Sequence, residues 1–313
     1  MSHSGTSPRL GRDAALAARA VRPGVLSTIT RYYSLTKPGV LYGNVLTTFA
    51  GYFLAAAAFG FDWRVFVGVV VGSTFVIASA CVLNNVLDRD IDTLMQRTST
   101  RATVTGAVGK VPATIFSIVL GVLGVALLIA TTNWLVVATG VGGFIVYVWF
   151  YGALSKRMSV HGTLVGSISG AAPILGGYLA ASGRFDLAAL AVFLMVFFWQ
   201  EPEFYAIAIY RREEYARAGV PVISVVRGTR RTTWEILVYT VLYVASSMLL
   251  PLFGFVGWTY TVIMGLLGLA WIALAIAGLR ASDVVAWSHK MFRASMVIIL
   301  ALCVMVSVGP LLP

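Results

Sequence analysis

The segment VFVGVVVGSTFVIASACVLNNVLDRDID, residues 65–92, joins a long apolar run to a cluster of acids and amides. Residues 65–83 carry no charge, and as a helix they would extend about 30 Å, the thickness of the hydrocarbon core of a bilayer. The stretch NNVLDRDID follows directly and holds three carboxylates and two amides where such a helix reaches water. Charge is costly at that depth, so this pattern predicts a membrane helix that ends in a functional site.

The composition of the whole chain is typical of an integral membrane protein. Hydrophobic residues make up 59% of the 313 residues, charged residues make up 11%, and the mean hydropathy is +0.88. A soluble domain carries roughly a quarter charged residues. We therefore predict an all-α fold, a polytopic membrane bundle of nine transmembrane helices. The predicted spans are 38–59, 66–87, 113–131, 133–154, 161–182, 187–209, 233–253, 256–278 and 290–311.

The distribution of basic residues predicts the orientation of this bundle. Of the 23 Lys and Arg, all but Arg64 and Arg184 fall in the N-terminal tail or in the loops after the second, fourth, sixth and eighth spans. The positive-inside rule then places the N-terminus in the cytoplasm, or in the matrix of a mitochondrion. The net charge of +11 indicates contact with anionic lipid of the bilayer, and no nucleic-acid partner is expected.

Two units follow from this pattern. Residues 1–32 are basic and contain no long apolar run, which predicts a disordered basic cytoplasmic tail rather than a signal peptide. Residues 33–313 form the predicted nine-helix transmembrane domain.

The acids after the second span have a spacing that suits metal binding. Asn84, Asp88 and Asp92 are four residues apart, so on a helix they line one face, whereas Asp90 points to nearly the opposite side. Like charges at this spacing repel, and oxygen ligands of this kind suit Mg²⁺ completed by substrate phosphates. Arg97 and Arg101 follow in the same loop, and together these residues indicate a diphosphate site. The alternative is solvated charge at the membrane surface.

A second polar stretch lies inside the sixth predicted span, in FFWQEPEFYAIAIY (197–210). Glu201 and Glu203 are ionisable groups at a depth where such groups normally face a cavity or pair with a base. Pro202 between them is expected to break the helix locally. Arg211 lies just beyond the span, and Lys156-Arg157 follow the fourth span. The alternative for these bases is that they only anchor helix ends.

Several of these residues together resemble a known family. NNVLDRDIDTLMQRTSTR, residues 84–101, is similar to the first aspartate-rich motif, NxxxDxxxD, of the UbiA-type intramembrane prenyltransferases. Within that family the chain is most similar to the haem O synthase (protohaem IX farnesyltransferase) branch. Three further stretches carry this likeness: LTKPGV (35–40), SKRMSVHGTLVGSISGAAP (155–173) and YAIAIYRREEYARAGVPVISVV (205–226). The resemblance runs from about Leu35 to the last span.

The resemblance implies a function and a set of site residues. The implied reaction is transfer of a farnesyl group from farnesyl diphosphate to a vinyl group of haem B, giving haem O and diphosphate with Mg²⁺ as cofactor. It implies that Asn84, Asp88 and Asp92 are the catalytic residues that bind Mg²⁺ and the diphosphate. The other implied substrate-binding residues are Arg97, Arg101, Lys156 and Arg157 for the diphosphate, and Asn44, Glu203, Tyr205 and Arg211 for the haem or prenyl cavity.

The resemblance also implies a location and partners. The location would be the bacterial inner membrane, in a multi-pass arrangement with a cytoplasmic N-terminus, and the mitochondrial inner membrane is the alternative. Haem B and farnesyl diphosphate would be the substrates, and a haem A synthase or a terminal oxidase assembly partner would be a protein partner.

Two positions depart from the branch, and three alternatives follow. Glu203 stands where the branch has a histidine, and Glu201 stands where it has Met or Pro.

A prenyltransferase for another acceptor, such as an aromatic quinone precursor, would carry a second DxxxD motif after the sixth span, where this chain has only Glu213-Glu214. The others are a membrane transporter and an inactive haem-binding relative, the latter suggested by Glu203.

Overall fold

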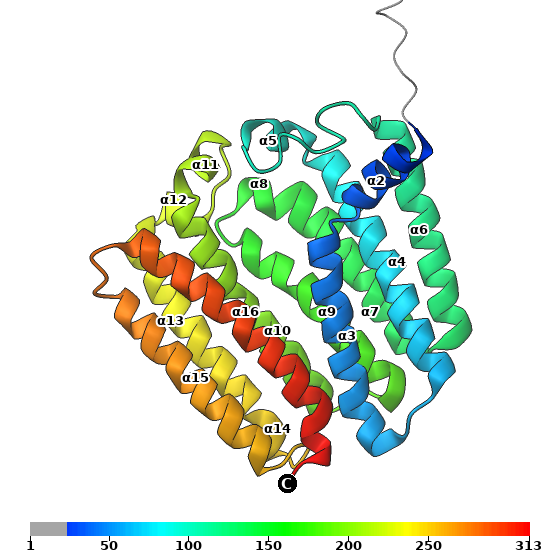
Figure 1. Cartoon of the computed structure of the whole chain (residues 1–313), viewed down its shortest axis with the longest axis vertical. Helices are drawn as coiled ribbons and strands as arrows, with labels where there is room; N and C mark the ends of the chain where they lie inside the picture. The colour runs from blue at the N-terminus through cyan, green and yellow to red at the C-terminus, as the bar shows by residue number, and fades with distance from the viewer. Residues whose placement is uncertain (1–23) are drawn as a thin grey trace, which may run out of the picture.

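The computed structural model describes residues 24–313, and every regular element in that range is a helix (Figure 1). Nine helices of the described range are long and apolar enough to cross a membrane, as predicted. These spans are α3 (Pro38–Phe59), α4 (Trp63–Leu87), α6 (Lys110–Thr131), α7 (Trp134–Ile145) continued by η1 (Val146–Ser155) and α8 (Lys156–Met158), α9 (Gly162–Ser182), α10 (Leu187–Tyr210), α13 (Gly228–Ser247) continued by α14 (Leu249–Leu252), α15 (Trp258–Gly278), and α16 (Val284–Val308) continued by η2 (Gly309–Leu311).

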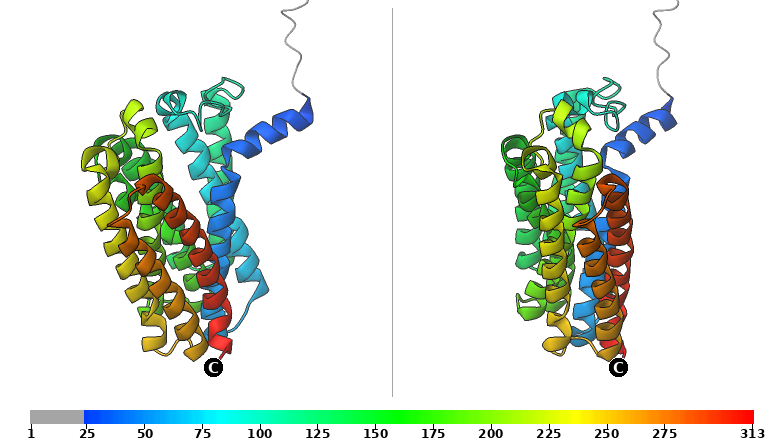
Figure 2. Two further views of the ribbon diagram at one scale, coloured as in Figure 1. Left: turned by 60° about the vertical axis from the view of Figure 1, so that its left-hand side comes forward. Right: turned by 90° about the vertical axis from the view of Figure 1, so that its left-hand side faces the viewer.

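The short helices lie outside the spans. They are α2 (Val25–Leu35), α5 (Arg89–Leu94), α11 (Arg212–Arg217) and α12 (Ile223–Val226). α2 projects from the end of the bundle at which α3 begins (Figure 2). Because α2 starts at Val25, its first eight residues lie within the tail predicted to be disordered, and the rest of that tail lies outside the described residues.

Polar side chains at the ends of the apolar runs set where several spans begin. Backbone N–H groups in the first turn of each of four spans donate hydrogen bonds to a capping side chain. The caps are the carboxylates of Asp62 for α4, Asp186 for α10 and Asp283 for α16, and the amide oxygen of Asn133 for α7. Such a cap stabilises a helix by about 1 kcal/mol. Asp283 is one reason why the ninth span begins at Val284, six residues before the predicted start at 290.

The spans pack in an order that closes the bundle. α3 contacts α4, α9 and α16, and α9 contacts α10, which packs on α13 and α16. The closest crossing is that of α3 and α9, where a Cβ added at Gly51 would lie 2.0 Å from the carbonyl oxygen of Ile174. A Cβ added at Gly177 would lie 2.1 Å from the carbonyl oxygen of Thr48. Glycine at both positions therefore lets the two backbones touch.

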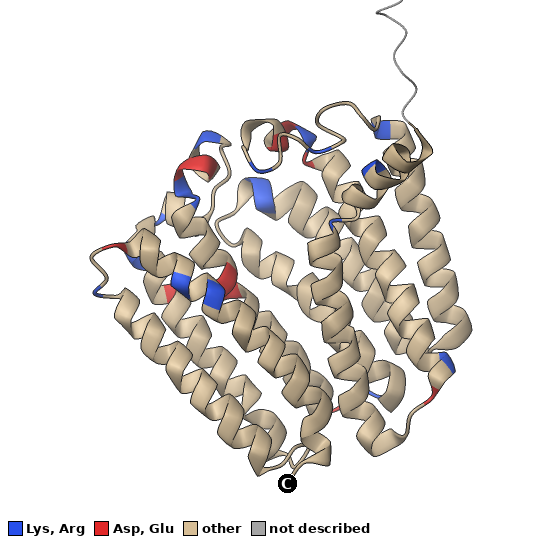
Figure 3. Cartoon of the chain, in the orientation of Figure 1, with Lys and Arg blue, Asp and Glu red and all other residues tan. Residues whose placement is uncertain are grey.

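A layer of short helices and loops covers one end of the bundle. Ile91 in α5 and Met95, which directly follows α5, pack with Val220 from the segment between α11 and α12. Most of the coloured charge lies at this end, and little lies at the opposite end (Figure 3). The chain crosses the bundle nine times within the described range, so α2 and the C-terminal Pro313 lie at opposite ends of the bundle.

This arrangement predicts the topology in the cell. A reporter fused after Pro313 should lie outside the cytoplasm, because the charged end of the bundle should face the cytoplasm. The measurement is paired activity of alkaline phosphatase and green fluorescent protein fusions, with a fusion before Met1 as the cytoplasmic control. A cytoplasmic signal from the fusion after Pro313 would contradict the orientation.

Candidate functional site

The acidic motif lies at the charged end of α4. α4 ends at Leu87 and α5 begins at Arg89, but the hydrogen-bond pattern continues through Asp88. The N–H of Asp88 donates to the carbonyl of Asn84, and the N–H of Asp92 donates to the carbonyl of Asp88, each over 2.8 Å. The predicted spacing is therefore preserved. Asn84, Asp88 and Asp92 are all buried, with 2%, 1% and 2% of their surface exposed.

Each of these three side chains contacts a base from a different part of the chain. Lys156 Nζ in α8 lies 2.5 Å from Asp88 Oδ2, and an Nη of Arg101 lies 2.5 Å from Asp92 Oδ2. Lys37, the residue before α3, donates from Nζ to Oδ1 of Asn84. The geometry thus brings the predicted Arg101 and Lys156 to the acidic face. Lys37 was missed, although the LTKPGV motif that contains it could have identified it.

Two other predicted diphosphate contacts lie elsewhere. Arg157 binds Asp90 through two hydrogen bonds of 2.7 Å and also donates to the carbonyl of Leu87. The Arg157 guanidinium holds the pKa of the Asp90 carboxyl well below its ordinary range. The Asp90 side chain is 67% exposed, so this pair lies on the solvent side of the motif, away from the buried face. Asp90 was predicted to point away from that face, whereas Arg157 was predicted to contact the diphosphate there.

Arg97 also lies away from the acidic face. Its side chain is exposed, and its backbone N–H donates to Oε1 of Glu214 over 3.3 Å. Arg211 Nη1 lies 2.9 Å from Oε2 of the same Glu214. Burial alone would raise the pKa of Glu214, but Arg211 and the Arg97 N–H outweigh it and lower that pKa. Glu214 therefore joins α11 to the loop after α5, and Arg211, which was predicted to line the haem or prenyl cavity, pairs with Glu214 at the start of α11.

The acidic face has the chemistry of a site for a hard cation. Asp88 Oδ1 and Asn85 Oδ1 are buried oxygen atoms with no hydrogen-bond partner, although buried acceptors are normally satisfied. Oxygen atoms of carboxylates and amides are the ligands that Mg²⁺ prefers. Within residues 24–313, no group of three or more His, Cys, Asp or Glu converges with metal-binding geometry. Asp88, Asp92 and amide oxygens therefore suit a cation that phosphate oxygens help to hold, rather than a closed all-protein site.

The second polar stretch lies on α10, which is continuous from Leu187 to Tyr210. The expected break at Pro202 is wrong, because a proline inside a helix removes a single backbone donor and the surrounding turns hold the helix together. Glu201 is fully buried, and its Oε1 accepts a hydrogen bond of 2.7 Å from Ser167 in α9. Its other oxygen, Oε2, has no partner.

Glu203 differs from its neighbour. It is half-buried, and among the described residues no hydrogen bond or ion pair engages its carboxyl group. The two bases that follow α10 are engaged elsewhere, because Arg211 pairs with Glu214 and Arg212 donates to the carbonyl of Ser224. The carboxyl group of Glu203 is therefore a polar group inside the sixth span that is available to bind a ligand.

Two further predicted cavity residues have distinct surroundings. Asn44 is half-buried in α3 and lies seven residues after Lys37, which places it about 10 Å deeper on nearly the same face. Its Nδ2 donates to the carbonyl of Val40. Tyr205 is 2% exposed and packs edge to face against Tyr239, with ring centroids 5.9 Å apart. Tyr205 is thus part of the packed core between α10 and α13.

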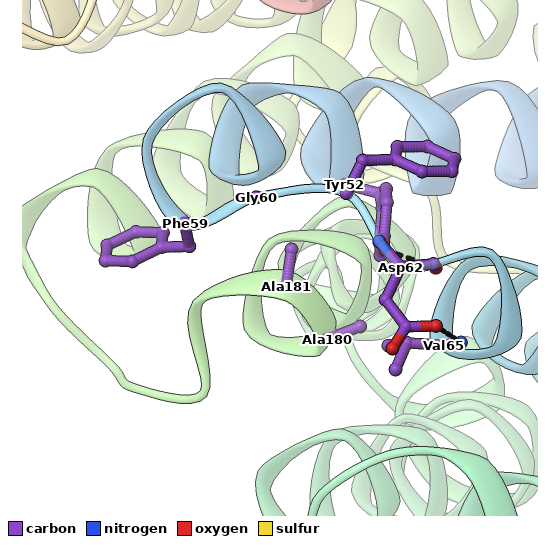
Figure 4. Close-up of a pocket in the computed structure, with 8 residues that line it drawn as sticks. Tyr52, Phe59, Gly60, Asp62, Val65, Ala180 and Ala181 are labelled. Carbon is purple, nitrogen blue, oxygen red and sulfur yellow. Dashed lines mark hydrogen bonds between the residues drawn. The ribbon is translucent and has the colours of Figure 1, made fainter.

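A small pocket at the opposite end of the bundle has no such chemistry. It has a volume of about 230 Å³ and lies between the loop from α3 to α4 and the end of α9 (Figure 4). The Asp62 carboxylate in its wall accepts the N–H groups of Arg64 and Val65 as the cap of α4. The Tyr52 hydroxyl donates to the carbonyl of Asp62. These polar groups stabilise the turn, and the acidic face remains the candidate site.

Comparison with known proteins identifies the class. The UbiA prenyltransferase family profile matches residues 44–297, and the chain belongs to this family. Protoheme IX farnesyltransferase 2 from Pseudomonas fluorescens is 42% identical over 281 residues, which cover 90% of this chain and 95% of that protein. Protoheme IX farnesyltransferase from Chromohalobacter salexigens is 43% identical over 277 residues, which cover 88% and 94%. The family predicted from the motifs is confirmed.

Solved structures confirm the fold. A structure of digeranylgeranylglyceryl phosphate synthase aligns with a TM-score of 0.77 over 90% of this chain and 98% of that one, at 18% identity. A UbiA homolog from Archaeoglobus fulgidus, bound to GPP and Mg²⁺, aligns with a TM-score of 0.65 over 88% and 99%, at 17% identity. The nine-helix all-α architecture is therefore that of UbiA-type proteins.

The buried Glu201 leads to a prediction on stability. Replacing Glu201 by Met should raise the melting temperature of the protein in detergent, because a buried polar atom without a partner costs about 1–3 kcal/mol. Ser167→Ala removes the one donor to Glu201 and should lower the melting temperature. Both are measured by thermal unfolding followed by size-exclusion fluorescence. A less stable Glu201→Met protein would show that Glu201 makes a contact that the lone Ser167 bond does not account for.

Proposed function

We propose that this chain is a haem O synthase, which transfers a farnesyl group from farnesyl diphosphate to a vinyl group of haem B and yields haem O and diphosphate. The observation that carries the proposal is the buried face of Asn84, Asp88 and Asp92 with its bases at the end of a membrane bundle. The names of relatives that are about 42% identical over nearly their whole length support the choice of substrates.

The acidic face would hold Mg²⁺ through Asp88, Asp92 and Asn84. Bound there, Mg²⁺ would offset the negative charge that develops on the diphosphate as the carbon–oxygen bond breaks. Lys156 and Arg101 lie beside the carboxylates and would donate hydrogen bonds to the diphosphate oxygens. The spans below them are apolar, which would keep water away from the allylic cation until the vinyl group of haem B attacks it. That attack forms the new carbon–carbon bond and leaves a cation on the other vinyl carbon, which would then take up one water molecule and lose a proton to give the hydroxyl group of haem O.

The loop after α10 favours haem over an aromatic acceptor. A second aspartate-rich motif would place carboxylates four residues apart, but this loop has only the adjacent Glu213 and Glu214, and Glu214 is held by Arg211 and by the Arg97 N–H. A transporter is a weaker alternative, because the buried acidic residues Asp88 and Asp92 lie at the end of α4 and in α5, at one end of the bundle, whereas ion sites of transporters lie near the membrane centre.

The remaining parts of the proposal concern location and partners. The protein is polytopic, and its similar relatives are bacterial. We infer the bacterial inner membrane, with the N-terminus and the acidic face on the cytoplasmic side. Haem O is itself a substrate for further haem modification, so a haem A synthase or a terminal oxidase assembly protein is the proposed partner.

Substitution of the two carboxylates tests the reaction. Asp88→Asn or Asp92→Asn should lower farnesyl transfer by about 100-fold or more, because a neutral amide is a weaker Mg²⁺ ligand and the diphosphate charge loses its stabilisation. The measurement is haem O formed from haem B by membranes of an expression host that lacks its own enzyme, analysed by chromatography and mass spectrometry.

The matched control is Asp90→Asn. Asp90 has the same chemistry two residues away, but it is exposed and paired with Arg157, and exposed pairs contribute only about 0–1 kcal/mol. It should retain most of the activity. Equal loss in all three variants would mean that general disruption of α5, and not the buried face, explains the effect; full activity of Asp88→Asn would remove the assignment.

Glu203 tests how the acceptor is held. Glu203→His should raise both haem affinity and the rate of farnesyl transfer, because an imidazole is a stronger iron ligand than an unpaired carboxyl group at this depth. Haem affinity is measured by absorbance titration of the purified protein, and haem O by mass spectrometry.

Glu203→Gln is the control for loss of charge alone, and it should not raise haem affinity. Should Glu203→His abolish transfer in an active protein, Glu203 would instead be a functional residue with its own way of binding the acceptor.

A further inference from the structure

The balance of charge at the acidic face is incomplete. Its two buried carboxylates, Asp88 and Asp92, each have a base of their own. The third base, Lys37, is bound to Asn84, which is neutral, and no ion pair within residues 24–313 includes it. A half-buried ammonium group without an anion is unfavourable. Bound Mg²⁺ would add further positive charge, so the site as a whole requires a polyanionic ligand.

The Asn84 side chain supplies a second, independent sign of a missing anion. Its Nδ2 is buried and has no acceptor, although its Oδ1 is engaged by Lys37. The surrounding backbone leaves little freedom, because a Cβ added at Gly152 in η1 would lie 3.1 Å from this Nδ2. An unsatisfied buried donor beside an unpaired ammonium group requires a ligand that is both negatively charged and rich in acceptor oxygens.

The backbone holds Lys37 in this position. With φ 53° and ψ 68°, Lys37 has a left-handed conformation, and it is the only non-glycine residue of the described range with a positive φ. Pro38 begins α3 immediately after it, and Asn85 Nδ2 donates to the carbonyl of Leu35 just before it. Two successive asparagines of α4 thus hold the turn. The Asn85 side chain binds the backbone carbonyl of Leu35, and the Asn84 side chain binds the ammonium group of Lys37. Strained backbone of this kind is concentrated at functional sites.

Lys37 also has hydrogen-bonding capacity to spare. An ammonium group has three donors. Nζ donates to Oδ1 of Asn84 and, over 3.5 Å, to the hydroxyl of Tyr147 in η1, so one donor remains. Lys37 can therefore donate to a ligand oxygen from the α3 side, whereas Lys156 and Arg101 approach from α8 and from the loop after α5.

We propose that Lys37, with the free amide N–H of Asn84, is a third basic ligand of the diphosphate and binds it from the α3 side of the acidic face. This role rests on the proposed function, because it takes the diphosphate of the prenyl donor as the ligand. Lys37 then helps to stabilise the leaving diphosphate together with Lys156 and Arg101.

Binding of inorganic diphosphate in the presence of Mg²⁺ tests this role without haem or turnover. Isothermal titration of the full-length protein in detergent compares wild type with Lys37→Met, which keeps the length of the side chain but removes its charge. The affinity of Lys37→Met should fall about tenfold or more, and Lys37→Arg should restore most of it. Lys110→Met, an exposed lysine at the start of α6, is the matched control and should bind as wild type does.

Labelling of the wild-type protein gives a readout that does not depend on a folded variant. Reductive methylation of lysines, quantified by mass spectrometry, should modify Lys37 more slowly when Mg²⁺ and diphosphate are present, and Lys110 should react equally in both conditions. Unchanged affinity of a folded Lys37→Met protein, or unchanged labelling of Lys37, would overturn the role of Lys37 alone. Failure of the wild type to bind diphosphate would overturn the proposed function and this role with it.

Discussion

The burial of two carboxylates at the end of a membrane helix is the constraint on which the covering layer depends. Asp88 and Asp92 expose only 1% and 2% of their surface, and a buried charge is stable only when it is paired and hydrogen-bonded. Lys156 comes from the end of the fourth span, 68 residues after Asp88, and Arg101 comes from the loop after α5, nine residues after Asp92. These two pairs therefore fix the loop and α8 relative to α4. Under the proposed function the same bases would then bind the ligand, because an entering metal and diphosphate would replace one set of charges by another.

The membrane architecture was predictable because it depends on composition and length. The first span was predicted as 38–59 and is observed as Pro38–Phe59, since Pro38 at its start and Gly60 just after its end bound the apolar run in the sequence. Other starts were displaced by up to six residues where a capping side chain such as Asp283 extends the helix into water. Helix breaking by Pro202 was the wrong expectation, because local propensity gave way to packing of α10 against its neighbours.

The site was predictable only as far as spacing determines it. The shared face of Asn84, Asp88 and Asp92 follows from the helical repeat, whatever the rest of the chain does. Which base meets which acid depends on how spans far apart in the sequence pack. Arg157 is adjacent to Lys156, yet it binds the exposed Asp90 while Lys156 binds the buried Asp88. Lys37 lies 47 residues before Asn84, and no local pattern links the two.

The segment from α8 to α9 connects the two polar regions of the bundle. Lys156 at its start binds Asp88 at the acidic face, and Ser167 further along binds Glu201 inside the membrane. Both contacts are made by one short stretch of chain, and α9 is in turn locked to α3 by the close crossing at Gly51 and Gly177. A displacement of α9 large enough to break one contact would therefore strain the other. The half-buried Glu203 on α10 lies two residues beyond Glu201, so the same helix pair fixes the position of Glu203 relative to the acidic face.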